Sequence, residues 1–371
     1  MIKKVTPRIE IDLAKLEHNA KRLKHFFENK GINITAVVKG VCSNIEISKR
    51  LVKCGINSLA DTKITNLKKL KEANIHATLI LLRTPSMSEI SDTIQFADIS
   101  VNTELEVVRA LSKEAKNQNK VHSIIVMVEM GDLREGILAK DVSSFIKEVL
   151  TFPNIRIVGI GTNFACFGGV IPTEEKMKEF SSIVERLENE LSLKFQYVSG
   201  GNSANYLWAS QVKNVGRINH LRLGESILLG KDTIEGLPIP GLYQNAFKFV
   251  AEVIESKWKP SVPFGKTAKN AFGETVTFQN RGIIQRAIVG VGRQDILVSG
   301  LTPLIPVEIL GSSSDHIILD SKHVRLKPGD EVPFSVDYGA LISAMTSPYV
   351  HKIFIDSNPF IHKDSYHKTI A

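Results

Sequence analysis

Residues 34–40 read ITAVVKG, an apolar and largely β-branched run that ends on a lysine and a glycine. Such a run predicts a strand buried on both faces, as in a parallel sheet. Seven further short runs of this kind follow before residue 224, and longer stretches separate them. The eight strand candidates are residues 34–38, 58–60, 78–82, 97–101, 123–129, 157–161, 195–199 and 219–223.

The stretches between these runs predict helices. In residues 103–116 and 173–191 the apolar side chains recur with helical spacing and fall on one face. Thr103 and Glu106 also have the spacing of a helix-capping box. Eight strands that alternate with helices predict an α/β fold, a (β/α)8 barrel of the TIM type, over residues 1–235.

The pattern changes at about residue 236, where the Pro/Gly-rich connector GLPIPGL begins. Six short β-type runs follow, with turn signals such as KPGD between them, and no helix of comparable length is expected. Residues 236–371 are therefore predicted to form a mostly β C-terminal domain, which residues 8–12 are candidates to join. The six runs are residues 246–254, 282–291, 307–310, 316–320, 331–336 and 349–355.

Composition excludes several classes of protein. The 371 residues, 43% of them hydrophobic, suffice for a substantial core. No apolar run approaches the roughly 20 residues that cross a bilayer, and the charged start MIKKVTPRIEID does not resemble a signal peptide, so no membrane association is expected. The cysteines, Cys42, Cys54 and Cys166, lack CxxC spacing, so we expect no disulfide framework, no metal site and a cytoplasmic location.

The net charge of +8 is compatible with nucleic acid, an anionic cofactor or an acidic substrate. A nucleic-acid binder needs clustered Lys and Arg with interleaved aromatic residues. The basic residues here are scattered, so no nucleic-acid partner is expected.

The loops that follow the barrel strands are the expected place for chemistry. Lys39 ends the first run, and a partly desolvated lysine there can form a Schiff base. A lysine that merely reaches solvent from a strand end gives the same pattern. Arg134 follows the fifth run in a turn bounded by glycines, where a guanidinium can bind a carboxylate, although an ordinary surface loop also fits.

Three later strand ends add to this set. The sixth run leads to Asn163, and the seventh leads to SGGNSA, where Asn202 or Ser203 can cap a helix or help bind a phosphate. Arg222 lies inside an apolar run and therefore needs a buried partner. A lysine nucleophile, a carboxylate binder and glycine-flanked phosphate sites on one rim suit pyridoxal phosphate bound covalently to Lys39.

At these residues the sequence resembles the alanine racemase type (fold type III) of pyridoxal-phosphate enzyme, and more narrowly the branch that contains ornithine racemase. The resemblance covers nearly the whole chain. It implies an amino-acid racemase, most closely an ornithine racemase, that works as a head-to-tail homodimer with each site built from two chains. The strings that carry it are DLREGI, GIGTNFACFGGVIPTEE, SGGNSA, LRLGESILLG, GRQD, GSSSDH and YGALISAMTSPYV.

The resemblance also implies roles for individual residues. Lys39 would bind the cofactor covalently and act as acid and base on one face of the substrate, and Arg134 would meet the substrate carboxylate. Asn163 stands beside the pyridine ring, where the family has a histidine, and Arg222 stands at the pyridine nitrogen. Further implied cofactor contacts are Ser203, Gly224, Glu225 and, without a strict match, Tyr349, and implied substrate contacts in the partner's site are Ser313 and Ser314.

The sequence departs from the family at the second acid/base group. Alanine racemases use a tyrosine in an SYG stretch of the partner's β domain, whereas the comparable strings here are PFG and AFG. Neither Phe264 nor Phe272 can exchange a proton. The candidates for this role are Asp295, His316 and, on the barrel side, Cys166.

The same sequence features leave functions other than ornithine racemisation open. Within the racemases, the substrate could be alanine or a broad set of amino acids. A basic amino-acid decarboxylase of the same barrel type has a loop that GSSSD faintly resembles, but the cysteine of that loop is missing. A non-catalytic pyridoxal-phosphate carrier resembles the barrel alone and does not explain the second domain. No carboxylate for a substrate side-chain amine can be chosen from the sequence.

Overall fold

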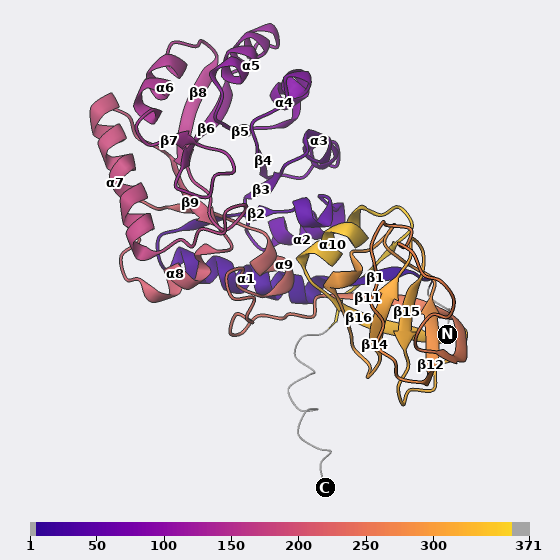
Figure 1. The fold of residues 1–371 in the computed structure, drawn as a ribbon. Coiled ribbons are helices and arrows are strands. Elements are labelled where there is room, and N and C mark those ends of the chain that lie inside the picture. The colour runs from indigo at the N-terminus through magenta and orange to yellow at the C-terminus, as the bar shows by residue number, and fades with distance from the viewer. Residues whose placement is uncertain (1–4, 358–371) are drawn as a thin grey trace. The chain divides into compact units, whose positions relative to one another are not determined.

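The computed structural model describes residues 5–357 and divides the chain into two units. One unit, Lys15–Gln244, holds the parallel strands and runs from indigo to pink in Figure 1. The other unit joins the N-terminal residues through Ala14 to the chain from Asn245 onward. None of the helices described is both long enough and apolar enough to cross a bilayer.

Eight parallel strands close into a barrel in the first unit (Figure 1). They pair in the order β5-β4-β3-β2-β10-β9-β8-β6, and β6 pairs again with β5. The predicted (β/α)8 barrel is therefore confirmed. A short additional strand, β7 (Ile137–Leu138), pairs with β6. The barrel strands are β2 (Asn33–Val37), β3 (Ser58–Asp61), β4 (Thr78–Leu81), β5 (Ile99–Asn102), β6 (His122–Glu129), β8 (Ile155–Gly161), β9 (Tyr197–Asn202) and β10 (His220–Leu223).

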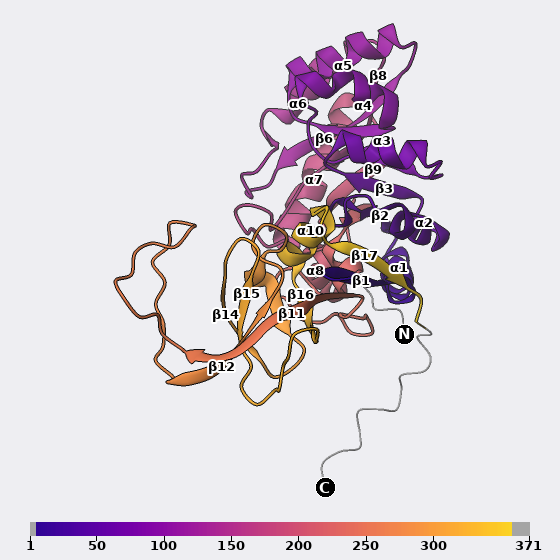
Figure 2. The same cartoon turned by 90° about the vertical axis from the view of Figure 1, so that its right-hand side faces the viewer.

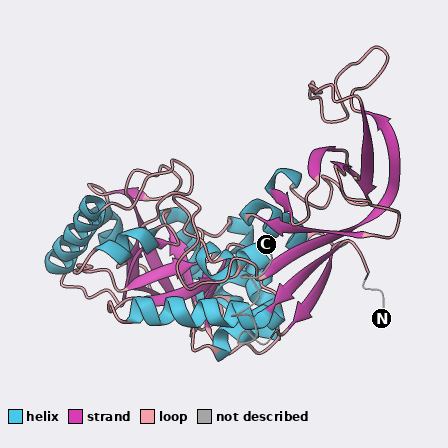
Figure 3. Ribbon diagram, turned by 90° about the horizontal axis from the view of Figure 1, so that it is seen from below, coloured by secondary structure: helices cyan, strands magenta, loops and turns pink. Residues whose placement is uncertain are grey.

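Helices connect these strands, and Figure 3 shows them in cyan. The capping box predicted at Thr103 and Glu106 is wrong. The helix α5 begins only at Leu105, and the Thr103 hydroxyl lies 3.0 Å from the hydroxyl of Thr84, which follows the neighbouring strand. The helices of this unit are α1 (Leu13–Glu28), α2 (Ile45–Lys53), α3 (Ile64–Glu72), α4 (Ile90–Phe96), α5 (Leu105–Asn117), α6 (Val142–Val149), α7 (Glu174–Leu191), α8 (Asn205–Gln211) and α9 (Glu225–Leu229), with short 3-10 turns at Lys39–Val41 and Met87–Glu89.

Apolar side chains from the strands pack against one another inside the barrel. Each of the Val, Ile and Met side chains among them stabilises the fold by roughly 1.5–3 kcal/mol when it is removed from water. Because the interior is filled, reactive groups belong at the strand ends. The buried cluster is Val37, Ala60, Ile80, Ile99, Val101, Ile125, Met127 and Val158.

The second unit is built on one mostly antiparallel sheet. Its main path runs β13-β16-β11-β12-β15-β14, and β1 pairs with β11 and, in parallel, with β17. Residues 8–12, which alternate like a strand in the sequence, form β1. The strands are β1 (Arg8–Asp12), β11 (Phe247–Pro260), β12 (Ile283–Val289), β13 (Leu301–Pro303), β14 (Glu308–Ser312), β15 (Ile317–Asp320), β16 (Glu331–Val336) and β17 (His351–Ile355).

Two features of this unit differ from a plain β domain. A helix that the sequence analysis did not predict, α10 (Tyr338–Thr346), follows β16. Asp337 caps this helix by accepting a hydrogen bond from the amide of Ala340 at 2.8 Å. A long loop, residues 261–282, joins β11 to β12 and extends beyond the sheet (Figure 2). Both phenylalanines of the PFG and AFG strings lie in this loop.

A buried charge network fastens β1 to its neighbours. Glu10 receives a hydrogen bond from Arg8 Nε at 2.9 Å and an ion pair from Lys248 at 2.8 Å, and Arg8 also binds Glu331 at 2.7 Å. The side chains of Arg8 and Glu10 are only 5% and 6% exposed. Burial opposes ionisation of Glu10, but the hydrogen bonds from Lys248 and Arg8 outweigh it and lower its pKa from 4.5 to about 2.

We predict that Glu10 makes stability fall in acid. Between pH 4.5 and about 2 the unfolded chain binds a proton at Glu10 that the folded chain does not, so stability is lost as the pH falls through this range, by up to about 3 kcal/mol. In Glu10→Gln this part of the dependence should disappear, which urea unfolding at several pH values will measure. Glu175→Gln, at an exposed residue of α7, is the control. An unchanged acid slope in the Glu10 variant would contradict the assignment.

Candidate functional site

Lys39 stands where β2 ends. It opens the 3-10 turn Lys39–Val41 and is half-buried, and within residues 5–357 no hydrogen bond or ion pair holds its amine. Gly224, just after β10, lies against the same strand end, because a Cβ on Gly224 would meet Val37 Cβ at 3.2 Å and Val37 O at 3.3 Å. Lys39 and the chain after β10 therefore occupy the same end of the barrel.

Arg222 is a buried cation in β10, 6% exposed. Its Nη2 donates to Thr162 O at 2.8 Å, and its Nη1 donates to the hydroxyl of Ser199. Burial, followed by the charge of Arg134, lowers the pKa of Arg222 to about 10, so the side chain is still protonated at neutral pH. The buried partners expected from the sequence are present, and among the described residues they are neutral oxygens rather than a carboxylate.

His220 extends this arrangement toward the barrel interior. Its Nδ1 lies 2.8 Å from Ser199 Oγ and its Nε2 lies 2.7 Å from Thr35 Oγ1. Burial, and then the charge of Arg222, lowers the pKa of His220 to about 3, so the ring is neutral. Since Ser199 accepts from Arg222, its own proton is available for Nδ1, and Nε2 then donates to Thr35. Sequence analysis missed His220, although its position two residues before Arg222 in one strand places both on one face.

Arg134 lies in a turn whose shape depends on glycine. Gly136 has φ +156°, and a Cβ there would stand 2.6 Å from Glu129 N and 2.7 Å from Glu129 Cα. In this turn the Arg134 guanidinium donates through Nε and Nη2 to both carboxylate oxygens of Glu135. Burial alone would lower the pKa of Arg134, but the hydrogen bonds to Glu135 outweigh it and raise that pKa. The sequence predicts that Arg134 binds the carboxylate of a substrate. In the structure it binds the carboxylate of its neighbour, Glu135.

Asn163 lies between the two arginines. With its amide oxygen turned toward Arg134, it accepts from Nη2 at 2.7 Å and from Nη1 at 2.9 Å. The other side of the same amide lies 3.4 Å from Arg222 Nη2 and 2.9 Å from Asn202 Nδ2. The structure thus brings together Arg134, Asn163 and Arg222, as the sequence reasoning required.

Asp132 holds the loop that carries Asn163 and was missed by the sequence analysis. Its carboxylate, 2% exposed, accepts the backbone amides of Cys166, Phe167 and Val170 at 3.0 to 3.3 Å. The loop after β8 is therefore fastened to the turn after β6. The acidic residue in DLREG was the available signal, but its partners are backbone groups that no sequence pattern identifies.

The Ser203 hydroxyl oxygen accepts hydrogen bonds from groups at the start of α9. Gly224 N, Ser226 N and Ser226 Oγ lie 3.2, 3.2 and 3.1 Å from its hydroxyl oxygen, and Ser203 and Ser226 are buried. Capping of α8 by Ser203 is therefore wrong, because the hydroxyl serves α9 instead and α8 has no side-chain cap. The sequence analysis named Gly224 and Glu225 as phosphate contacts. In the structure the two amides that contact Ser203 are those of Gly224 and Ser226.

These groups fit pyridoxal phosphate. The cluster of Ser203, Gly224 and Ser226 offers hydroxyls and amides at one point, which is what a phosphate requires. The Thr162 hydroxyl, also at this end, is buried without a hydrogen-bond partner in the described part of the chain. Arg222 donates and cannot accept, which suits an unprotonated ring nitrogen. The donor chemistry and an unpartnered buried hydroxyl thus agree with the expected cofactor.

The remaining predicted contacts lie in the β unit. Ser313 and Ser314 form the turn between β14 and β15, and Tyr349, 61% exposed, donates its amide to Ser347 Oγ at 3.1 Å. The carbonyls of Ser313 and Ser314 accept the amides of Arg293 and Gln294 at 3.0 and 2.8 Å. These serines are thus tied to the GRQD segment within their own unit.

The candidates for the second acid/base group differ in their surroundings. Asp295 Oδ1 accepts from Ser347 Oγ at 2.7 Å, and His316 Nδ1 lies 2.7 Å from Asp315 Oδ1. Cys166 is exposed, with its sulfur 3.4 Å from Asn202 Nδ2.

The two phenylalanines of the PFG and AFG strings are both accessible. Phe264 is 90% exposed, and Phe272 stacks on the Arg293 guanidinium at 4.3 Å. Within residues 5–357, no group of three or more His, Cys, Asp or Glu is placed to hold a metal ion.

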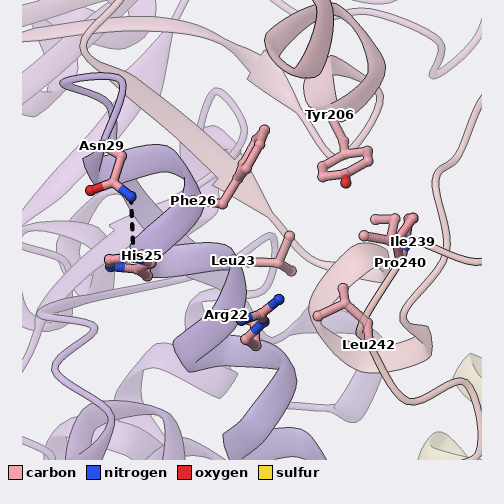
Figure 4. A pocket seen from close by; sticks show the side chains of 9 residues that line it. All are labelled: Arg22, Leu23, His25, Phe26, Asn29, Tyr206, Ile239, Pro240 and Leu242. Atoms are coloured by element: carbon pink, nitrogen blue, oxygen red, sulfur yellow. Dashed lines mark hydrogen bonds between the residues drawn. The ribbon is translucent and has the colours of Figure 1, made fainter.

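A separate pocket lies away from these strand ends. It is formed by α1, by Tyr206 of α8 and by residues 239–242 (Figure 4). Phe26 and Tyr206 pack together on one side of it, with their ring centroids 5.2 Å apart, and Asn29 bonds His25 nearby. None of the predicted site residues lines this pocket.

Comparisons with known proteins agree with this geometry. Residues 11–232 match the family model described as alanine racemase, N-terminal domain. Ornithine racemase of Acetoanaerobium sticklandii is 41% identical over 350 residues, 93% of this chain and 99% of that protein. Lysine racemase of Thermotoga maritima is 39% identical over 353 residues, 94% and 99% of the two chains. The structure of alanine racemase from Clostridium difficile has a TM-score of 0.74 at 20% identity over 96% of this chain and 97% of that one, which shows the fold.

We predict that Ser203→Ala weakens cofactor binding. The change leaves the amides of Gly224 and Ser226 without their buried acceptor and removes one phosphate ligand, so affinity for pyridoxal phosphate should fall about 10- to 100-fold. Titration of the apoprotein, followed by absorbance, measures this. Ser182→Ala, at a serine whose hydroxyl bonds its own helix α7, is the matched control. Equal affinities in the two variants would refute the phosphate role.

Proposed function

Because this chain belongs to the alanine racemase family, we propose that it racemises a diamino acid, ornithine first of all, at the barrel end that carries Lys39 and Arg222. The chain is an amino-acid racemase that uses pyridoxal phosphate, as the enzymes of this family do. What supports a diamino acid is that both relatives matched over nearly their whole length, ornithine racemase and lysine racemase, are named for one.

The strand-end residues divide the work of such a reaction. Bound pyridoxal phosphate supplies an electron sink that makes the Cα proton of the amino acid acidic. Ser203, Gly224 and Ser226 would hold the phosphate, and Lys39 would hold the cofactor covalently. The amine of Lys39, which no described neighbour engages, would be the group that takes or returns a proton at Cα on its own face.

Arg222 sets how strong that sink is. A guanidinium that donates to the ring nitrogen leaves no room for a proton there, so the ring withdraws electrons less than a protonated ring does. A carbanion that is only weakly stabilised is reprotonated quickly, which favours racemisation over side reactions. Asn163 lies beside this arginine and also contacts Arg134. Arg134 would bind the substrate carboxylate with two parallel hydrogen bonds.

The other face needs its own proton carrier, for which Asp295, His316 and Cys166 are the candidates. We propose a head-to-tail homodimer in which Ser313, Ser314 and Tyr349 serve the site of the second copy, and we expect the enzyme in the cytoplasm. The exposure of Tyr349 and the lack of CxxC spacing among the cysteines support these two proposals.

We predict that Lys39→Ala abolishes both covalent cofactor binding and turnover. The visible absorbance of the lysine-bound cofactor should be absent, and no substrate should racemise, because the amine that would bind the cofactor and carry the proton is removed. Lys49→Ala, at an exposed lysine of α2 that pairs with Glu46, should keep both properties. An unchanged spectrum in the Lys39 variant would remove Lys39 from this role.

We further predict that the purified enzyme with pyridoxal phosphate racemises L-ornithine with a higher kcat/KM than L-alanine, and that L-lysine is also a substrate. Chiral chromatography of a panel of L-amino acids measures the rates, and carbon dioxide release is followed in parallel. Release of carbon dioxide without the D-enantiomer would instead identify a decarboxylase. A preference for alanine would make this an alanine racemase, and no reaction with any amino acid would defeat the proposal.

A further inference from the structure

The strand-end site is strongly cationic. Lys39, Arg134 and Arg222 all stand at this end of the barrel, and the charge of Arg134 contributes to the lowered pKa of Arg222. A substrate whose side chain carries a second ammonium would meet repulsion here unless a carboxylate compensates it. Such a carboxylate must be able to turn toward the substrate ammonium.

Two acidic residues near Arg134 are already engaged by the backbone. Asp132 is buried, and its two oxygens accept the amides that fasten the loop after β8. Glu129 accepts the amides of Gly131 and Leu133 and so holds its own turn together. Neither can turn toward a substrate without giving up the turns that position the site.

Glu135 differs from both, because its partner is the substrate-binding arginine itself. Its carboxylate receives two hydrogen bonds from Arg134, through Nε and Nη2. The side chain of Arg134 is 35% exposed and that of Glu135 is 25% exposed. Glu135 therefore holds Arg134 in the way that a substrate carboxylate would. Glu135 occupies the Nε/Nη2 pair of Arg134, and the Nη1/Nη2 pair faces Asn163. Two carboxylates cannot both occupy the Nε/Nη2 pair, so a substrate that binds Arg134 through these two donors displaces Glu135.

Resting on the proposed function, we propose that Glu135 selects diamino acids by an exchange of ion pairs. The α-carboxylate of the substrate takes the place of Glu135 on Arg134, and the released carboxylate of Glu135 receives the side-chain ammonium of the same substrate. One internal ion pair is replaced by two pairs with the ligand, and no charge is left without a partner.

The same exchange rejects substrates with neutral side chains. Alanine brings a carboxylate to Arg134 but no ammonium for Glu135, so the displaced glutamate loses its partner beside the site. Leaving a partly buried charge unpaired costs more than the pair contributed, and selectivity arises from this penalty as well as from attraction. Only a substrate that carries both charges compensates both residues.

The test compares L-ornithine with L-norvaline, which has the same carbon chain without the side-chain amine. In Glu135→Gln the kcat/KM for ornithine should fall about 10- to 100-fold, the effect of losing a charge-assisted hydrogen bond, while that for norvaline should stay the same or rise. In Glu135→Asp the carboxylate is retracted by one methylene, so the preference for L-lysine over L-ornithine should increase. Absorbance of the bound cofactor confirms that each variant is loaded.

Glu89→Gln is the matched control, since Glu89 also pairs with an arginine, Arg83, after a barrel strand. It should leave the ratio of ornithine to norvaline unchanged. If Glu135→Gln lowers both substrates equally, Glu135 only orients Arg134, and the inference is wrong. If it changes neither, Glu135 does not face the substrate. A wild-type enzyme that fails to racemise any diamino acid would defeat the proposed function itself, a result distinct from these.

Discussion

The burial of one guanidinium, that of Arg222, organises the whole strand-end site. A cation inside a barrel must be compensated, and a carboxylate would be the usual partner. Here neutral oxygens of Thr162 and Ser199 do so. Ser199 lies in β9, which pairs with β10, and Thr162 directly follows β8, the next strand along the barrel. The charge is therefore stabilised without being neutralised, and the pKa falls only to about 10. A carboxylate beside Arg222 would weaken its action on a ring nitrogen, whereas these oxygens leave it free to donate.

The same constraint explains why His220 must be neutral. A protonated imidazole beside Arg222 would place two cations in the core, and burial together with that charge keeps the pKa of His220 near 3. The neutral ring links Ser199 to Thr35, so a chain of hydrogen bonds runs from the guanidinium to the middle of β2. Each member is held by the next, which fixes the rotamer of Arg222 more firmly than apolar packing alone would.

The sequence predicts those parts of the structure that leave a regular pattern along the chain. Eight strands and the residues at their ends follow from alternation along one chain, and Lys39 and Arg222 were found in that way. Partners that depend on long-range register were not: Ser226 reaches Ser203 across two loops, and Asp132 binds backbone amides more than thirty residues away. The error at Thr103 has the same origin, since a hydroxyl on the neighbouring strand end competed with the local cap.

In the β unit, three of the strings that resemble the racemase branch converge on one another. Gly292 has no room for a side chain, because a Cβ there would stand 2.5 Å from Asp315 N and Ser313 O, and the following amides bond to the GSSSDH turn. Asp295, from GRQD, bonds Ser347 of the C-terminal string. The GRQD segment is thus tied to both of the other strings. Asp295 and His316 lie on this scaffold and are held by neighbouring side chains, whereas Phe264 stands 90% exposed in its loop. A group that must exchange a proton at a fixed point needs such support, which the loop does not give Phe264.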